Sequence, residues 1–142
     1  MKLVIDANEL FSAIMSKGVG RQTKKLDILF SEKIKLFAPS LLFRELEKNE
    51  TEIKSKSGFS DTDFNIFVGI IKLRIKSVSV SEFSKFLSKA KKISPHEKDI
   101  PYFAVALSLN CPIWSGEKRL KRQFKVKIFN TPELLEEFES LK

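Results

Sequence analysis

The chain has 142 residues, of which 42% are hydrophobic, 31% are charged and thirteen are Phe, so it fits one folded domain over residues 1–142 and excludes an intrinsically disordered protein. Lys and Arg outnumber Asp and Glu by 26 to 18, and the net charge of +8 favours a nucleic-acid or acidic partner, although lysine-rich surfaces also serve solubility. The single cysteine excludes an internal disulfide and a Cys-rich zinc site, and the short N-terminal apolar run, broken by Asp6, predicts a soluble cytoplasmic protein without a membrane span.

The first part of the chain alternates short β-prone runs with helical patterns. In chain order it predicts a strand at 2–5, a helix at 8–15, a loop at 17–21, a helix at 26–32, a strand at 33–37 and a helix at 41–46. The polar stretch 49–60 contains Gly58 and indicates a loop or a frayed helix end.

The second part continues the alternation. It predicts a helix at 61–73, a strand at 75–80, a helix at 81–91, a loop at 93–96, a helix at 98–109, a strand at 112–114, a short basic helix at 116–124, a strand at 127–129 and a helix at 131–141. Alternating strands and helices predict an α/β fold, a three-layer α/β/α arrangement with a central parallel sheet. Ligands are then expected at the carboxyl ends of the strands.

Four acidic residues stand at strand ends or in the helices that follow them. Asp6 closes the first strand, where a half-buried carboxylate needs a compensating cation such as a metal ion, and Glu117 follows a late strand in the same way. Glu45 can face inward from its helix, although most such glutamates are surface residues, and Asp99 lies in a first helical turn, where capping is its ordinary role. Together these oxygens would suit Mg²⁺ or Mn²⁺ better than zinc.

The segments VIDANELFSAI, FRELEK and PHEKDIPYFAVALSLNCPIWSGEKRLK resemble the PIN-domain family in order and spacing, over nearly the whole chain. The resemblance implies a ribonuclease in which Mg²⁺ or Mn²⁺ clamps the scissile phosphate and activates a water for in-line attack. Its catalytic and metal-binding residues would be Asp6, Glu45, Asp99 and Glu117.

Three further residues are expected to support these acids. Glu117 stands where the family more often has aspartate, so Ser115 and Glu97 are expected to contribute more than usual to metal or water binding. Asn8 either caps the first helix or orients Asp6.

A basic cluster follows Glu117 directly. Lys118, Arg119, Lys121 and Arg122 are expected to bind the RNA backbone, with a solvated helix face as the alternative. Many PIN domains of this size are toxins of toxin–antitoxin pairs, so the resemblance also implies an antitoxin-like protein partner and a homodimer.

Three other functions stay open. The first is a PIN-fold RNA-binding module that cleaves weakly or not at all because of Glu117. The second is a phosphatase-like hydrolase with Asp6 as nucleophile, which Asn8 in place of a second acid disfavours. The third is a structural domain whose acids are helix caps and surface charges.

Overall fold

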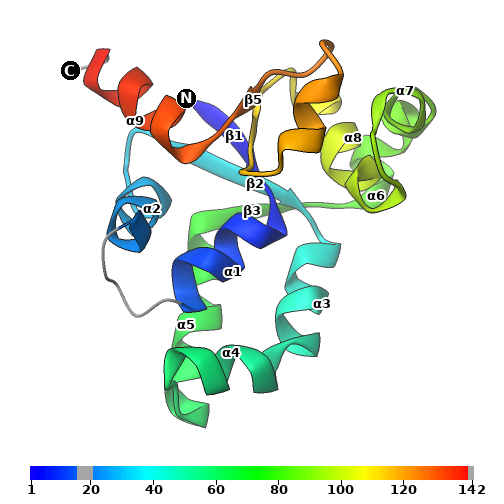
Figure 1. Ribbon diagram of the computed structural model, residues 1–142. Helices are drawn as coiled ribbons and strands as arrows, with labels where there is room; N and C mark the ends of the chain where they lie inside the picture. Colours follow the sequence, from blue (N-terminus) through cyan, green and yellow to red (C-terminus); the bar gives the residue numbers. More distant parts are fainter. Residues whose placement is uncertain (16–20, 141–142) are drawn as a thin grey trace.

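A parallel five-stranded sheet forms the centre of the computed structural model, which describes residues 1–15 and 21–140. The strand order within this described part is β3-β2-β1-β4-β5 (Figure 1). The strands are β1 (Lys2–Ile5), β2 (Lys35–Pro39), β3 (Ile75–Val78), β4 (Ile113–Trp114) and β5 (Ile128–Phe129). Every pairing is parallel, which confirms the predicted sheet.

Helices cover both faces of this sheet. They are α1 (Ala7–Met15), α2 (Arg21–Leu29), α3 (Leu41–Lys48), α4 (Glu50–Ser57), α5 (Asp61–Arg74), α6 (Val80–Phe83), α7 (Leu87–Ile93), α8 (Ile100–Leu109) and α9 (Thr131–Ser140), with 3₁₀ turns η1 (Ser84–Phe86), η2 (Glu97–Asp99) and η3 (Lys118–Arg122). On one face α8 packs across β1, β2 and β4, and α6 and α7 pack on α8; α1, α2, α4 and α5 belong to the opposite layer (Figure 1). This is the predicted three-layer α/β/α fold. None of the helices in the described ranges combines the length and the apolar character that crossing a membrane requires.

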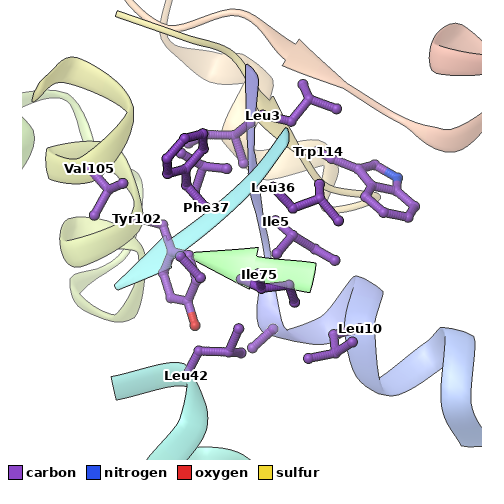
Figure 2. Close-up of a cluster of buried hydrophobic side chains, with 14 of the residues drawn as sticks. Leu3, Ile5, Leu10, Leu36, Phe37, Leu42, Ile75, Tyr102, Val105 and Trp114 are labelled. Carbon is purple, nitrogen blue, oxygen red and sulfur yellow. The ribbon is translucent and has the colours of Figure 1, made fainter. Parts of the chain in front are cut away.

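The central strand β1 explains why the sequence begins with an unbroken apolar run. Leu3, Val4 and Ile5 are all fully buried, because β1 lies between β2 and β4 and is covered by helices on both faces. Trp114 of β4 is also fully buried (Figure 2), and its indole Nε1 donates to Thr131 Oγ1 at 3.1 Å. The core therefore fixes the strand ends from which the candidate site is built.

The stretch 49–60 was predicted as a loop or a frayed helix end; the loop is wrong, because most of the stretch forms the separate helix α4. One apolar residue, Ile53, is fully buried and anchors the helix, which contacts α1. Lys54 pairs with Glu50 one turn earlier at 2.6 Å, and Gly58 ends the helix with a left-handed φ of 77°. A single apolar residue gives no periodic pattern, so the sequence does not predict this helix.

Several predicted boundaries also changed. The helix at 81–91 is divided into α6, η1 and α7; all three contact α8, and the tighter 3₁₀ turn redirects the chain while Phe83 and Ala90 stay buried. The basic helix at 116–124 is the 3₁₀ turn η3. Most of the predicted loop at 17–21 and the end of the helix at 131–141 lie outside the described residues.

Candidate active site

Asp6 follows β1 at the point where the strand order reverses. The chain leaves β1 toward β2 and β3, and later returns across the sheet to β4 on the other side of β1. In open α/β sheets this switch point leaves a crevice at the carboxyl ends of the strands, where ligands bind. The backbone N–H of Asp6 donates to the carbonyl of Trp114 at 3.1 Å, so the ends of β1 and β4 are held together there.

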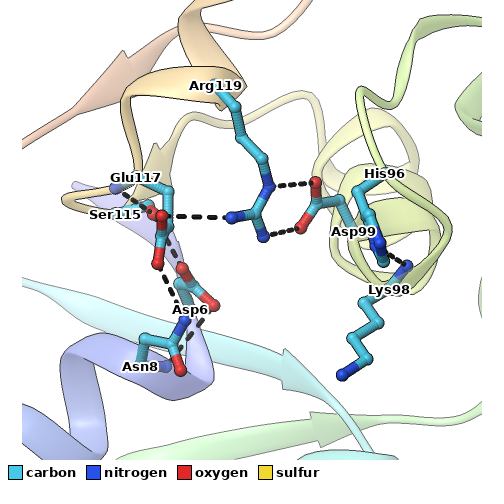
Figure 3. Close-up of polar contacts among 8 residues, drawn as sticks. All are labelled: Asp6, Asn8, His96, Lys98, Asp99, Ser115, Glu117 and Arg119. Carbon is cyan, nitrogen blue, oxygen red and sulfur yellow. Dashed lines mark hydrogen bonds and ion pairs between the residues drawn. The ribbon is translucent and has the colours of Figure 1, made fainter.

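A hydrogen-bonded group of four residues joins these two strand ends (Figure 3). Ser115 is buried and its hydroxyl donates to Asp6 Oδ2 at 2.7 Å, while the same hydroxyl accepts from the backbone N–H of Glu117 at 3.1 Å. Asn8 Nδ2 donates to Glu117 Oε1 at 3.0 Å. The structure thus brings Asp6, Asn8, Ser115 and Glu117 together from segments more than a hundred positions apart, since Ser115 and Asp6 are separated by 109 residues in the sequence.

Arg119 links this group to Asp99 (Figure 3). Its Nε and Nη2 donate to the two carboxylate oxygens of Asp99 at 3.1 and 3.0 Å, and its Nη1 donates to Glu117 Oε2 at 3.1 Å. The parallel pair is the geometry in which guanidinium and carboxylate bind most strongly. The hydrogen bond to Asp99 raises the pKa of Arg119 above its ordinary value, so the group stays cationic.

Glu45 approaches the same region from α3. It lines an open cavity of about 730 Å³ together with Asn8, Glu97, Lys98 and Arg119. Burial raises the pKa of Glu45, and the charge of Asp6 adds to that shift, whereas Lys98 and Lys48 oppose it. Glu97 is exposed at the rim of this cavity. Glu45 and Glu97 therefore lie close to the hydrogen-bonded group of Asp6, Asn8, Ser115 and Glu117, because Asn8 lines the same cavity.

The electrostatics of Asp6 show why a cation suits this place. Burial raises the pKa of its carboxyl, hydrogen bonds from Ser115 and Asn8 oppose the shift, and the charges of Asp99 and Glu117 raise it further. Negative charge is thus concentrated at a partly dehydrated point, which a cation would relieve.

The donor set fits a hard divalent ion in its chemistry, because it consists of carboxylate oxygens with hydroxyl and amide support. As arranged within residues 1–15 and 21–140, no group of three or more His, Cys, Asp or Glu side chains is ready to hold a metal ion. Arg119 explains this arrangement, since its guanidinium takes up oxygens of both Asp99 and Glu117. A metal ion that binds through these particular oxygens would require Arg119 to release them.

The predicted RNA-binding residues all lie on η3 but differ in their contacts. Lys118 and Arg122 are exposed on η3, Arg119 faces the acids, and Lys121 pairs with Glu133 at the start of α9. Beside them the structure adds a residue that sequence reasoning passed over. Phe124 is 96% exposed, and only its position among basic residues could have marked it.

Two further residues near the site were missed. The Tyr102 hydroxyl is buried and, within the described part of the chain, makes no hydrogen bond. Burial raises its pKa far above the ordinary value, and the charges of Glu45 and Asp6 add to this shift. The sequence offers one signal for Tyr102. It lies three positions after Asp99, and residues at this spacing are neighbours on the surface of a helix. Glu9, three positions after Asp6, is also buried.

The chain is similar to known proteins in two respects, its sequence family and its fold. A family model described as PIN domain matches residues 4–137. The fold is similar to the crystal structure of VapBC2 from Rickettsia felis bound to a DNA fragment from their promoter, with a TM-score of 0.67 and 13% sequence identity, over 92% of this chain and 98% of that chain. No curated protein matches the sequence.

Proposed function

Because the chain belongs to the PIN-domain family, we propose that it is a divalent-metal-dependent ribonuclease that hydrolyses RNA phosphodiester bonds. One observation carries the proposal. At the switch point of the sheet, Asp6, Asp99 and Glu117 gather around a cationic group, the guanidinium of Arg119. The clustered carboxylates favour a bound cation, which can be a metal ion. Because the PIN-domain family comprises nucleases, we infer that this ion acts on a phosphodiester.

Each acidic residue has a distinct place in the proposed mechanism. Asp6, Glu45, Asp99 and Glu117 would hold Mg²⁺ or Mn²⁺ through carboxylate oxygens, and the ion would supply a Lewis acid for the phosphate and the attacking water. Ser115 fixes one oxygen of Asp6, and Asn8 fixes one oxygen of Glu117. Such supporting hydrogen bonds orient acidic ligands before they bind.

The proposed substrate follows from charge and from one exposed aromatic ring. Lys118 and Arg122 leave η3 into solvent, and Phe124 is exposed a few residues later. Basic side chains attract a phosphate backbone, and an exposed ring gives an unpaired base a stacking surface. We therefore assign the surface formed by Lys118, Lys121, Arg122 and Phe124 to single-stranded RNA, while Glu97 keeps its proposed place as a support for metal or water binding.

The decisive experiment is a cleavage assay on labelled structured and single-stranded RNAs in Mn²⁺, in Mg²⁺ and in EDTA. Asp6→Asn and Asp99→Asn should each abolish cleavage, because each removes one negative ligand and little volume. Glu47→Gln is the matched control, since Glu47 is an exposed glutamate on α3, two residues from Glu45. Cleavage that persists in EDTA, or in both aspartate variants, would refute the proposal.

A noncatalytic RNA-binding module is the second candidate, and the engagement of Arg119 with Asp99 and Glu117 favours it. If Arg119 never releases Asp99 Oδ1, Asp99 Oδ2 and Glu117 Oε2, these oxygens are not free to bind a metal ion. Binding of RNA that weakens steeply with salt, without cleavage in Mn²⁺, would support the module.

We further propose a toxin–antitoxin role in the cytoplasm, with an antitoxin-like partner and a homodimer. The similarity in fold to the VapBC2 structure supports the partner.

An apolar stripe on α5, formed by the exposed Ile66, Ile70 and Leu73, supports self-association, because a two-fold axis buries such a stripe against its own copy. Leu73→Glu should convert a dimer to a monomer in light scattering, whereas Lys72→Glu on the same helix should not; a chain that is monomeric before mutation would contradict the dimer.

A further inference from the structure

Glu9 is a buried charge that the proposed hydrolysis does not use. It lies on α1 and is 5% exposed. Its Oε2 is 3.1 Å from Lys25 Nζ of α2, an ion-pair distance, but within the described residues that oxygen accepts no hydrogen bond. Lys25 Nζ also donates to Ser12 Oγ at 2.8 Å. Burying such a pair costs desolvation that an apolar pair would avoid, and the unused acceptor position on Oε2 leaves that cost uncompensated until a donor reaches it.

A cavity opens directly beside this pair. It has a volume of about 460 Å³ and its lining includes Glu9, Lys24, Lys25, Gly116, Pro132 and Leu135. It therefore lies between α1, α2 and the start of α9, at the carboxyl ends of β1, β4 and β5 (Figure 1). Its volume is within the range of small-molecule sites.

Gly116 connects the cavity to the candidate active site. It stands between Ser115, which bonds Asp6, and Glu117, which bonds Asn8 and Arg119. A Cβ atom at position 116 would lie 2.7 Å from Glu9 Oε1. A side chain there would force the carboxylate to move, so glycine keeps the Glu9 carboxylate at the cavity wall.

We propose that this cavity binds a guanine base of the RNA, next to the phosphate that is cleaved; the proposal rests on the proposed ribonuclease function. The Watson–Crick edge of guanine presents two adjacent donors, N1–H and N2–H, followed by the acceptor O6. Oε2 of Glu9 is closed to solvent in the structure, so the carboxylate turns toward the cavity to accept the two donors, and Lys25 then donates to O6. Pro132 and Leu135 provide apolar contact for the ring, and Lys24 is placed for a flanking phosphate.

The other bases match the pair less well. Adenine offers one donor group beside an acceptor nitrogen, cytosine offers one donor group beside two acceptors, and uracil places its single donor between two acceptors. A carboxylate facing any of these would leave one oxygen against an acceptor. Sites that hydrogen-bond a ligand reject analogues that lack the matching group, because buried polar atoms are then left unpaired.

The test is a titration of the ¹⁵N-labelled protein in EDTA with guanosine, inosine and adenosine 5′-monophosphates, followed at the Gly116 amide. Guanosine monophosphate should bind about tenfold more tightly than inosine monophosphate, which lacks the 2-amino donor, and more tightly still than adenosine monophosphate. Glu9→Gln should remove the preference for guanosine monophosphate, as should Gly116→Ala through its Cβ. Glu47→Gln should keep it.

Equal affinities for the three nucleotides, or an unchanged preference in Glu9→Gln, would overturn the guanine pocket. The comparison of guanosine with inosine uses the unmutated protein, so it decides the question even if Glu9→Gln fails to fold. Because EDTA prevents metal-dependent cleavage, the titration is independent of catalysis. A chain that prefers guanosine monophosphate but cleaves no RNA would refute the nuclease and keep the pocket, and the reverse result would do the opposite.

Discussion

Arg119 holds Asp99 through two parallel hydrogen bonds, from Nε to Oδ2 at 3.1 Å and from Nη2 to Oδ1 at 3.0 Å. The same guanidinium donates to Glu117 at 3.1 Å. The cation that balances these acids is therefore part of the chain itself. In the proposed nuclease a metal ion would compete with Arg119 for carboxylate oxygens, so we expect Arg119 to raise the concentration of ion that is needed to fill the site.

Arg119→Gln should accordingly tighten Mn²⁺ binding by about tenfold, because the ion no longer displaces a paired guanidinium. Binding can be measured by titration calorimetry and by the Mn²⁺ electron paramagnetic resonance signal. Arg122→Gln removes the same charge from an exposed position on the same 3₁₀ turn and serves as control. Equal affinity in the two variants would mean that Arg119 does not compete with the ion.

Asp6→Asn should raise the free energy of unfolding in EDTA by about 0.5–1 kcal/mol. The pKa of Asp6 is raised by burial, so the folded protein binds this proton more tightly than the unfolded chain and the charged form costs stability at neutral pH. The gain should be largest near pH 7 and shrink as the pH falls through the raised pKa. Urea unfolding across this range measures it; a gain that grows toward acid would contradict the sign.

Asp99→Asn is the matched comparison in the same measurement. It removes the partner of Arg119, whose side chain is partly exposed, so the expected loss is at most about 1 kcal/mol. The two substitutions should thus act in opposite directions on stability, although each is expected to abolish cleavage.

Tyr102→Phe should leave the unfolding free energy unchanged or raise it by up to about 1 kcal/mol. The hydroxyl is buried and makes no hydrogen bond among the described residues, so its removal ends a desolvation cost without loss of a partner. Thermal unfolding in EDTA provides the measurement. A clear loss of stability would indicate that the hydroxyl has a partner in solution, such as an ordered water.

Phe124→Ala should weaken binding of a single-stranded RNA by roughly tenfold and leave the melting temperature unchanged. The ring is 96% exposed, so it adds little to the core, while base stacking on an aromatic ring contributes about 1–3 kcal/mol. Fluorescence anisotropy in EDTA measures the affinity. Phe30→Ala, at an exposed ring after α2, is the control, and an equal effect of both changes would remove Phe124 from the RNA surface.

The sequence predicted those features of the fold that depend on the spacing of apolar residues and on the alternation of strands and helices. The apolar run before Asp6 indicated β1, and the parallel sheet followed from the alternation of elements. The pattern failed at α4, where one buried residue, Ile53, and two lysine–glutamate pairs stabilise a helix with no apolar stripe. The spacing of apolar residues along the sequence cannot show such contacts.

The structure brings the predicted residues Asp6, Asn8, Ser115 and Glu117 together, while their roles in metal binding and catalysis stay predictions. The order of the acids indicated that Asp6 and Glu117 meet, but the direction of a side chain depends on its partners. Arg119 was expected to face RNA and instead contacts Asp99 and Glu117, while its RNA-binding role stays a prediction. Glu9 resembles a solvated helix residue in the sequence, and its burial depends on α2 and on the missing side chain of Gly116.

The central position of β1 also determines when the chain can complete its site during synthesis. Asp6 emerges from the ribosome first, but its partner Ser115 follows 109 residues later, and β1 cannot pair with β4 before then. Contacts this distant in sequence are slow to form, because a long loop has to close first. A nascent chain, still attached beside its own messenger RNA, therefore carries only half of the proposed nuclease, and the other half arrives with the last strands.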